Sequence, residues 1–159
     1  MQNNHTALDK LAYGVYVVTL RNEAVINAFT ASWISQVSFD PPLIMIAVHR
    51  AHFSHFLLAG GGNFAINILG ENQGELARLF YTPVGAEEQE RVGVPFITRK
   101  SGAPILREAM AYLDCQLVTS YEAGDHTIYL GQVIDSGVAR EGNPLTTQQL
   151  GERYANSRQ

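Results

Sequence analysis

Small and hydroxyl-bearing side chains are concentrated at the start of the stretch from Ala28 to Ser54, where Thr30, Ala31, Ser32 and Ser35 follow one another closely. Small side chains let a flat ligand approach the backbone, and hydroxyl groups offer it hydrogen bonds. This stretch is therefore a candidate binding segment for a planar organic molecule.

A candidate anion site follows in the chain. Apolar residues recur at helical spacing from Phe53 to Leu58, which predicts a helix that begins near His52 without Ser, Thr, Asp or Asn before it. The first amides of such a helix lack a side-chain acceptor, and the helix dipole favours an anion there. With Arg50 beside these amides and Ser54 in the first turn, the pattern predicts a phosphate site. The alternative is an ordinary solvated helix start with a surface arginine.

The other reactive side chains give weaker evidence for a functional site. His49, His52 and His55 are spaced by three residues, which raises the alternative of a metal or haem site, but no Cys, Asp or Glu completes the set. Cys115 lies among apolar neighbours and is expected to be a packed, inert thiol. The sequence offers no Ser-His-Asp or Cys-His arrangement for nucleophilic catalysis, and no metal ligands are assigned.

Composition narrows the class of protein. The chain has 159 residues, 46% of them apolar and 16% charged, and is expected to form a single domain over 1–159. A net charge of -4 with 11 scattered Lys and Arg argues against nucleic acid as a partner. The first ten residues lack a signal-peptide pattern and no run is apolar enough to span a membrane, so a cytoplasmic location is expected.

Strand patterns dominate the elements that must position these residues. Many short strands with few helices indicate a closed antiparallel barrel and not a doubly wound sheet. Leu43 to Val48, after Asp40-Pro41-Pro42, is almost wholly apolar and is expected to be buried on both faces. The predicted strands are Tyr13 to Leu20, Ala24 to Thr30, Leu43 to Val48, Asn63 to Leu69, Ala109 to Tyr121 and Thr127 to Ala139.

Two further segments carry specific expectations. Asn72 is predicted to cap a helix that runs to Tyr81, with Glu75 completing a capping box. The stretch from Thr82 to Pro104 is predicted to be a long loop that covers a site or a subunit edge, with Glu87, Glu88 and Glu90 as a solvated turn. Asn67, polar within an apolar strand, either bonds neighbouring backbone or reaches a ligand.

Several spaced motifs together resemble the flavin reductase-like family, the FMN-binding split barrels, from about Leu8 to Tyr154. The run from Ala31 to Gln36 also resembles the C-terminal flavin domains of flavodiiron proteins. The motifs that carry the family resemblance are Gly14 to Thr19, Thr30-Ala31-Ser32, Ser35-x-Val37-Ser38-x-x-Pro41-Pro42-Leu43, Phe64-x-x-Asn67-Ile68-Leu69, Gly124-Asp125-His126, Gly131-x-Val133 and Pro144-Leu145.

The resemblance implies a mainly β fold, a six-stranded antiparallel Greek-key split barrel with a few short helices. It also implies a homodimer that holds FMN, or alternatively FAD, near the subunit interface. His126 would face the nicotinamide side of the flavin ring as a catalytic residue, with Tyr154 a weaker candidate. The cofactor-binding residues it implies are Thr30, Ala31, Ser32, Trp33, Ser35, Gln36, Val37, Arg50, Ser54 and Asn67.

Three functions follow as alternatives. In the first, the protein is an NAD(P)H:flavin oxidoreductase that takes a hydride from NADH or NADPH onto the flavin and passes electrons to an acceptor, and His126 is a hydrogen-bond donor or orienting group. For His126 the plain alternative is a turn histidine bonded to Asp125. The second function is a non-catalytic FMN carrier that exchanges electrons with a protein partner. The third is the histidine-rich metal or haem module.

Overall fold

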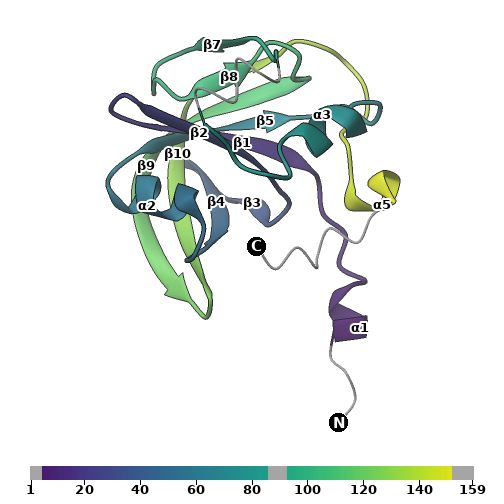
Figure 1. Ribbon diagram of the computed structural model, residues 1–159, viewed down its shortest axis with the longest axis horizontal. Helices are drawn as coiled ribbons and strands as arrows, with labels where there is room; N and C mark the ends of the chain where they lie inside the picture. The colour runs from purple at the N-terminus through teal and green to yellow at the C-terminus, as the bar shows by residue number, and fades with distance from the viewer. Residues whose placement is uncertain (1–4, 86–92, 152–159) are drawn as a thin grey trace.

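Eight antiparallel strands form the main sheet of the computed structural model, which describes residues 5–85 and 93–151 (Figure 1). The strands of this sheet follow the order β3-β4-β10-β9-β5-β1-β2-β6, and β7 pairs with β8 in a second, two-stranded sheet. The strands are β1 (Tyr16–Asn22), β2 (Val25–Ala31), β3 (Ile34–Phe39), β4 (Pro42–His49), β5 (Asn63–Ile68), β6 (Val84–Gly85), β7 (Phe96–Thr98), β8 (Pro104–Leu106), β9 (Ala111–Ala123) and β10 (His126–Val138).

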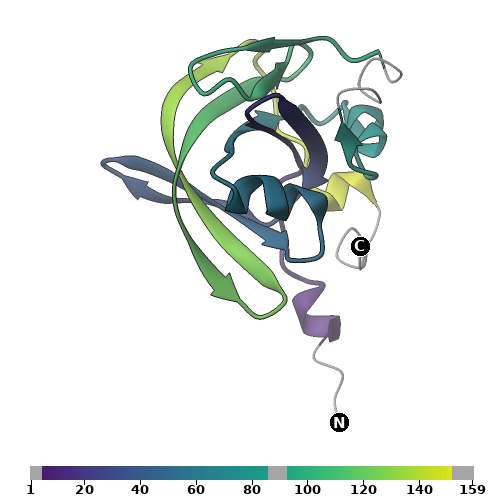
Figure 2. The same ribbon diagram turned by 60° about the vertical axis from the view of Figure 1, so that its left-hand side comes forward.

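The main sheet curls into a barrel (Figure 2). One stretch of chain connects strands near the two ends of this sheet. The chain runs from β2 through Ser32 and Trp33 directly into β3, while β2 and β3 lie near opposite ends of the strand order. The expected barrel class is confirmed. The expected count of six strands is wrong, because β3 and β6 extend the other six strands at either end of the order.

Within the described ranges, four short helices accompany the sheet: α1 (His5–Leu8), α2 (Phe53–Ala59), α3 (Gly74–Leu79) and α5 (Thr147–Leu150). α2 and α3 lie on different sides of the barrel (Figure 1). Among the described residues, no helix has both the length and the apolar character needed to cross a membrane.

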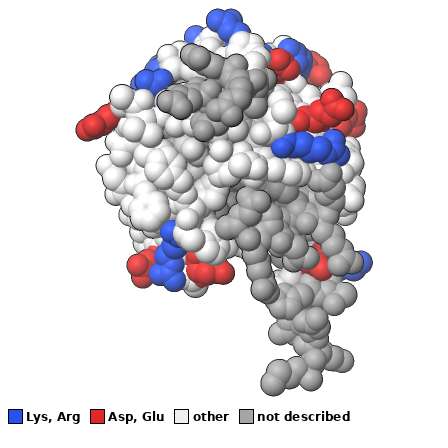
Figure 3. Space-filling model, in the orientation of Figure 1, with Lys and Arg blue, Asp and Glu red and all other residues white. Residues whose placement is uncertain are grey.

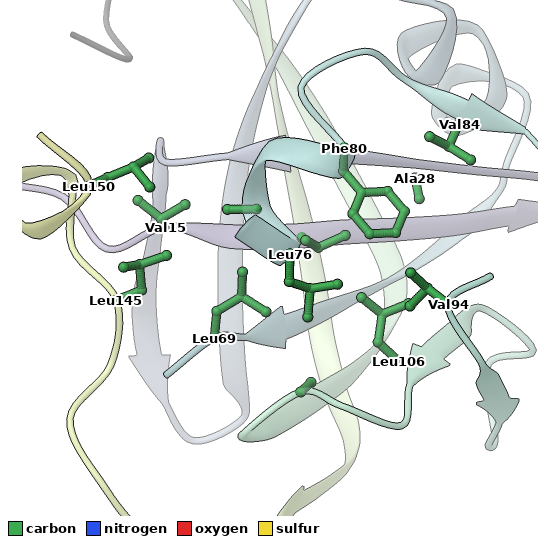
Figure 4. Packing of buried hydrophobic residues seen from close by; sticks show 13 residues of the cluster. Val15, Ala28, Leu69, Leu76, Phe80, Val84, Val94, Leu106, Leu145 and Leu150 are labelled. Carbon is green, nitrogen blue, oxygen red and sulfur yellow. The ribbon is translucent and has the colours of Figure 1, made fainter. Parts of the chain in front are cut away.

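Of three buried clusters among the described residues, the two larger ones pack beneath the helices. The cluster around α2 includes Leu57, Leu58, Phe64 and Tyr129. The cluster under α3 and α5 includes Phe80, Leu76, Leu145 and Leu150 (Figure 4). Burial of this apolar surface is the main force that holds the short helices to the barrel.

Gly131, part of a sequence motif, is required by packing. A Cβ at this position would come within 2.7 Å of Cε1 of Phe64, clash with its Cζ, and lie 3.0 Å from Cβ of Cys115. Only glycine lets β10 pass this close to β5 and β9, whose side chains fill the core.

Two detailed expectations are wrong. β4 is not buried on both faces within this chain: Ile44, Ile46 and Val48 are buried, and the residues between them are half-buried. Such alternation is typical of a sheet with one covered face. Asn72 does not cap α3, whose N-cap residue is Gln73 and has no side-chain cap.

Gln73 instead accepts a hydrogen bond from Gly70 N through Oε1 at 2.9 Å, and its Nε2 donates to the carbonyl of Glu108 at 2.6 Å. The predicted long loop contains β6 and β7, and its acidic turn at 87–90 lies outside the described residues.

Charged side chains of both signs are interspersed near the edge of the face shown in Figure 3. The part of the centre that is formed by described residues carries few of them.

Candidate functional site

The first part of the candidate binding segment belongs to the barrel wall. Thr30, Ala31 and Ser32 are all buried. The hydroxyl of Thr30 donates to the carbonyl of Ala77 at 2.6 Å, and its amide donates to the carbonyl of Phe80 at 2.9 Å. These bonds tie β2 to the end of α3, so the side chain of Thr30 serves the fold.

The second part of the segment faces outward. Trp33 is 41% exposed and Val37 is 49% exposed, and Ser35 and Gln36 are exposed as well. Locally, the hydroxyl of Ser35 donates to the carbonyl of Gln36 at 3.0 Å, and Nε2 of Gln36 donates to the carbonyl of Ser38 at 3.1 Å.

β3 combines two features that free backbone groups. It stands at the end of the strand order, so among the described residues no strand pairs with its outer edge. Its pairing with β4 shifts between Gln36 and Ser38, which leaves Val37 without a partner on β4. A bulge of this kind leaves its extra residue unpaired, so the backbone of this edge can bond a ligand.

The start of α2 has the free end that the sequence predicts. His52 occupies the N-cap position and provides no side-chain cap. Ser54, in the first turn, is fully buried, and its hydroxyl donates to Oδ1 of Asn27 at 3.0 Å. The first turn therefore offers backbone amides, whereas the hydroxyl of Ser54 is already bonded within the protein.

His52 is also notable for its ring. Nδ1 of His52 is buried and has no hydrogen-bond partner among the described residues. Burial, and secondly the neighbouring His49, lower the pKa of His52. The imidazole at this helix start is consequently neutral near pH 7.

Arg50 joins the start of α2 to the turn between β9 and β10. Its amide donates to the carbonyl of Asp125 at 3.0 Å, and its guanidinium donates to the carbonyl of Gly124. Gly124 has a φ of 61°, in the left-handed region that favours glycine. The side chain predicted to hold a phosphate thus also holds the Gly124-Asp125 turn.

His126 lies at this corner with three partners. Its Nδ1 is 2.6 Å from Oδ1 of Asp125. Its ring centroid is 4.7 Å from that of Trp33, at an interplanar angle of 41°, and 5.2 Å from that of His49. The residue before β3, the last residue of β4 and the β9–β10 turn therefore meet around one imidazole.

The pKa of Asp125 is lowered, mainly by its hydrogen bond with His126, against an opposing effect of burial, and to a lesser degree by the charges of His126 and His49. The other carboxylate oxygen lies 3.9 Å from Nε2 of His49. A carboxylate with a lowered pKa is ionised at neutral pH, so it can only accept hydrogen bonds.

Asn67 is not part of this corner. It is fully buried, its amide nitrogen donates to the carbonyl of Val17 at 3.0 Å and to the hydroxyl of Thr19 at 3.1 Å, and its oxygen accepts from Leu106 N at 2.8 Å. Both ends of the amide are thus satisfied by β1 and β8. Tyr154 lies outside the described residues.

The three spaced histidines do not converge. The ring of His52 lies 4.9 Å from that of Phe29, and Nδ1 of His55 is 2.6 Å from the hydroxyl of Tyr129. His49 ends β4 and faces the β9–β10 turn instead. Among the described residues, no group of three His, Cys, Asp or Glu side chains is arranged to hold a metal ion.

Cys115 is buried, as expected. Burial raises the pKa of its thiol to about 12, with a smaller contribution from Asp114. The thiol is therefore protonated and unreactive near neutral pH.

The sequence reasoning missed His49 and the Trp33–His126 contact as parts of the site. They follow from two pairings: His126 opposes His49 across β10 and β4, and the carbonyl of Trp33 accepts from the amide of Ala47 in β4 at 3.0 Å. No local pattern in the sequence predicts which residue of β4 lies opposite His126, although the Gly-Asp-His motif identifies the residue on β10.

Comparison with known proteins identifies the family. The profile of the flavin reductase like domain matches residues 8–155. The reductase component of a 4-nitrophenol 4-monooxygenase/4-nitrocatechol 2-monooxygenase from Rhodococcus opacus is 35% identical over 135 residues, which cover 85% of this chain and 70% of that protein. Diflavin flavoprotein A 1 of Synechocystis is 34% identical over 84% of this chain, and the matched part is 24% of its own length.

Solved structures agree in fold. The flavin reductase component of a bacterial two-component tryptophan halogenase superposes with a TM-score of 0.78 at 31% identity and covers 89% of both chains. An NADH:FAD oxidoreductase of Streptomyces globisporus superposes with a TM-score of 0.76 at 33% identity, covering 87% of this chain and 78% of its own. Together with the matched family profile, these similarities show that the chain belongs to the flavin reductase-like domain family.

Proposed function

We propose that this protein is an FMN-binding oxidoreductase of the NAD(P)H:flavin reductase type. The observation that carries the proposal is the corner at which Trp33, just before β3, the uncapped start of α2 and the Gly124-Asp125-His126 turn meet, in a chain of this family. The contact between Trp33 and His126 and the bonds from Arg50 to the turn tie these three parts together.

The flavin ring would lie along the outer edge of β3. The unpaired backbone at Val37 and the free edge can donate hydrogen bonds to ring oxygens and nitrogens, where negative charge grows on reduction. The small residues Ala31 and Ser32 allow the ring to come close to the backbone. Trp33, Ser35 and Gln36 would border it with exposed side chains.

The FMN phosphate would bind at the first turn of α2. Free amides and the positive end of the helix dipole attract an anion, and Arg50 adds a full positive charge beside them. Ser54 would contribute its amide, because its hydroxyl is bonded to Asn27. FAD is the alternative, since a solved relative is named an NADH:FAD oxidoreductase.

The bound flavin would supply hydride acceptance and electron storage. The chain then needs no nucleophile, and the buried, protonated Cys115 provides none. His126 would border the nicotinamide of NADH or NADPH, held in place by Trp33 and Asp125. The main contribution of the protein would be to align two planar rings, the flavin and the nicotinamide.

A homodimer is also proposed. Phe39 is 91% exposed at the end of β3, and Val118 and Tyr121 of β9 are exposed as well. On the less buried face of β4, Leu43, Met45 and Ala47 remain half-buried. A second copy would cover these apolar groups, and light scattering on the purified protein would measure the mass that tests this.

The second candidate is an FMN carrier that exchanges electrons with a protein partner. Relatives named diflavin flavoproteins favour it, because this chain matches 24% of their length and the remaining sequence belongs to other parts of those proteins. The outer edge of β3 and the α2 site would have the same roles in both candidates. They differ in that only the reductase would bind a nicotinamide, bordered by His126.

One experiment separates the candidates. The purified protein is loaded with FMN, its visible flavin spectrum is recorded, and NADH or NADPH is added without oxygen. Rapid loss of the oxidised flavin spectrum is expected. A protein that binds FMN yet is reduced only by dithionite or by a partner would be the carrier, and a protein that binds no flavin would contradict both.

A further inference from the structure

His126 and its neighbours make more interactions than a histidine in an exposed turn requires. Asp125 is 77% exposed, yet its carboxylate faces two imidazoles, with Oδ1 2.6 Å from His126 Nδ1 and Oδ2 3.9 Å from His49 Nε2. An exposed carboxylate is free to point into water, so its place between two rings requires an explanation.

The tautomer of His49 follows from its other contact. Nδ1 of His49 accepts a hydrogen bond from the amide of Ala51 at 3.1 Å. In a neutral imidazole one nitrogen accepts and the other carries the proton. His49 therefore presents an Nε2–H group toward Asp125.

The same reasoning applies to His126. The carboxylate of Asp125 is an acceptor, because its lowered pKa keeps it ionised. A contact of 2.6 Å between this acceptor and Nδ1 of His126 places the proton on Nδ1. Nε2 of neutral His126 then carries a lone pair, and it makes no hydrogen bond to any other residue that the structure describes.

The ring is also fixed in orientation. Trp33 lies against it with centroids 4.7 Å apart, and His49 meets it edge-on at 76°. His126 is the first residue of β10, and Arg50 anchors the preceding turn through its amide and guanidinium. Rotation of the imidazole would break these contacts together.

We propose that Asp125 is a positioning residue that holds His126 in the Nδ1–H form, so that Nε2 accepts a hydrogen bond from an N–H group of the bound ligand. From the sequence, His126 is expected to be a hydrogen-bond donor or an orienting group, and the acceptor role of Nε2 differs from the first of these. His49 and Trp33 hold the carboxylate and the ring in place.

The ligand group that fits is a primary amide, because it offers N–H donors beside a flat ring. The carboxamide of a nicotinamide is such a group. This second step rests on the proposed function, whereas the tautomer does not.

The tautomer is measured directly by NMR. Uniformly ¹⁵N-labelled, flavin-loaded protein is studied at about pH 8.5, two units above the ordinary pKa of histidine. Long-range ¹H–¹⁵N correlations distinguish protonated Nδ1 from protonated Nε2, and His126→Gln assigns the signal. We expect protonated Nδ1 in the wild type and a shift toward protonated Nε2 in Asp125→Ala.

Glu122→Ala is the matched control. Glu122 is an exposed carboxylate on the same hairpin that pairs with Thr127 and does not contact His126. It should leave the tautomer unchanged, and Asp125→Glu should retain part of the Nδ1–H form. Protonated Nε2 in the wild type, or no change in Asp125→Ala, would overturn the proposal, and the wild-type spectrum alone suffices should the variant fail to fold.

The ligand step is tested with the reduced 3-acetylpyridine analogue of the dinucleotide, which lacks the amide N–H groups. The preference in kcat/KM for the natural dinucleotide over this analogue should fall about threefold to tenfold in both His126→Ala and Asp125→Ala, the range expected for one hydrogen bond. An unchanged preference would overturn this step. Absence of hydride transfer in the wild type would contradict the proposed function and leave the NMR result standing.

Discussion

The guanidinium of Arg50 donates to the carbonyl of Gly124, 74 residues further along the chain. This bond joins the residue before α2 to the turn that carries His126. It makes the region predicted for a phosphate and the region predicted for a nicotinamide parts of one rigid corner. Substitution of Arg50 should therefore affect both.

Arg50→Ala should weaken FMN binding much more than riboflavin binding. A hydrogen bond to a charged group contributes about 1.5–3 kcal/mol, or roughly tenfold to a hundredfold in Kd. Fluorescence titration with the two flavins measures both affinities. Arg140→Ala is a suitable control, because Arg140 is exposed and also donates to a backbone carbonyl, that of Glu108, at 2.9 Å. Equal losses for FMN and riboflavin would argue against a phosphate at α2.

Trp33→Ala should slow hydride transfer by loosening His126. Aromatic pairs contribute about 0.5–1.5 kcal/mol beyond their buried area, which corresponds to roughly twofold to tenfold in kcat/KM for NADH or NADPH. Stopped-flow absorbance at saturating FMN measures the rate, and Trp33→Phe should retain most of it. A loss of FMN affinity with an unchanged reduction rate would mean that Trp33 acts on the flavin and not on His126.

Ser54→Ala should destabilise the fold. It removes the donor to Oδ1 of Asn27 within the core, and an unsatisfied buried acceptor costs about 1–3 kcal/mol. Chemical denaturation measures the free energy of unfolding. Ser35→Ala, on the exposed edge of β3, should change it by less than about 0.5 kcal/mol. If Ser54→Ala keeps the full free energy of unfolding, the hydrogen bond to Asn27 does not stabilise the fold.

Gly131→Ala should be destabilised by overpacking. The new methyl group would meet the ring of Phe64 and Cβ of Cys115, both of which are fully buried. Overpacking of this kind costs about 1–3 kcal/mol. Thermal unfolding gives the comparison, and Gly131→Ala combined with Phe64→Leu should recover part of the loss. No change in the single variant would contradict the packing argument.

The stability of the protein should fall in alkaline solution through Cys115. The pKa of its thiol is raised from 9.0 to about 12 in the folded state, so above pH 9 the unfolded chain loses a proton that the folded chain keeps. Unfolding is favoured progressively from pH 9 up to about 12. Cys115→Ala should remove this component of the pH dependence, measured by denaturation at a series of pH values.

Alkylation provides a separate check on the same thiol. Native protein at pH 8 should react with iodoacetamide far more slowly than protein unfolded in guanidinium chloride. Equal rates would show that Cys115 is accessible in the folded protein.

Local patterns in the sequence were enough for the barrel class and most of its elements. The paired strands around Gly124-Asp125, the apolar strand after Pro42, and the helix that begins without a capping side chain were all predictable, because turn residues and hydrophobic periodicity act over a few neighbouring residues. The motif Gly131-x-Val133 was visible too, although its packing reason was not.

Tertiary structure decided which of the candidate residues meet. The pairing of His126 with His49, the bond from Arg50 to Gly124, and the burial of Ser54 against Asn27 all depend on strand register across the closed sheet. Register is set by which faces the whole barrel buries and by the bulges that shift it, and a shift of one residue would turn each side chain to the opposite face. The sequence by itself therefore determined the elements and the candidate residues, and the closed barrel determined that Trp33, His49, Asp125 and His126 share one corner while Asn67 serves the core.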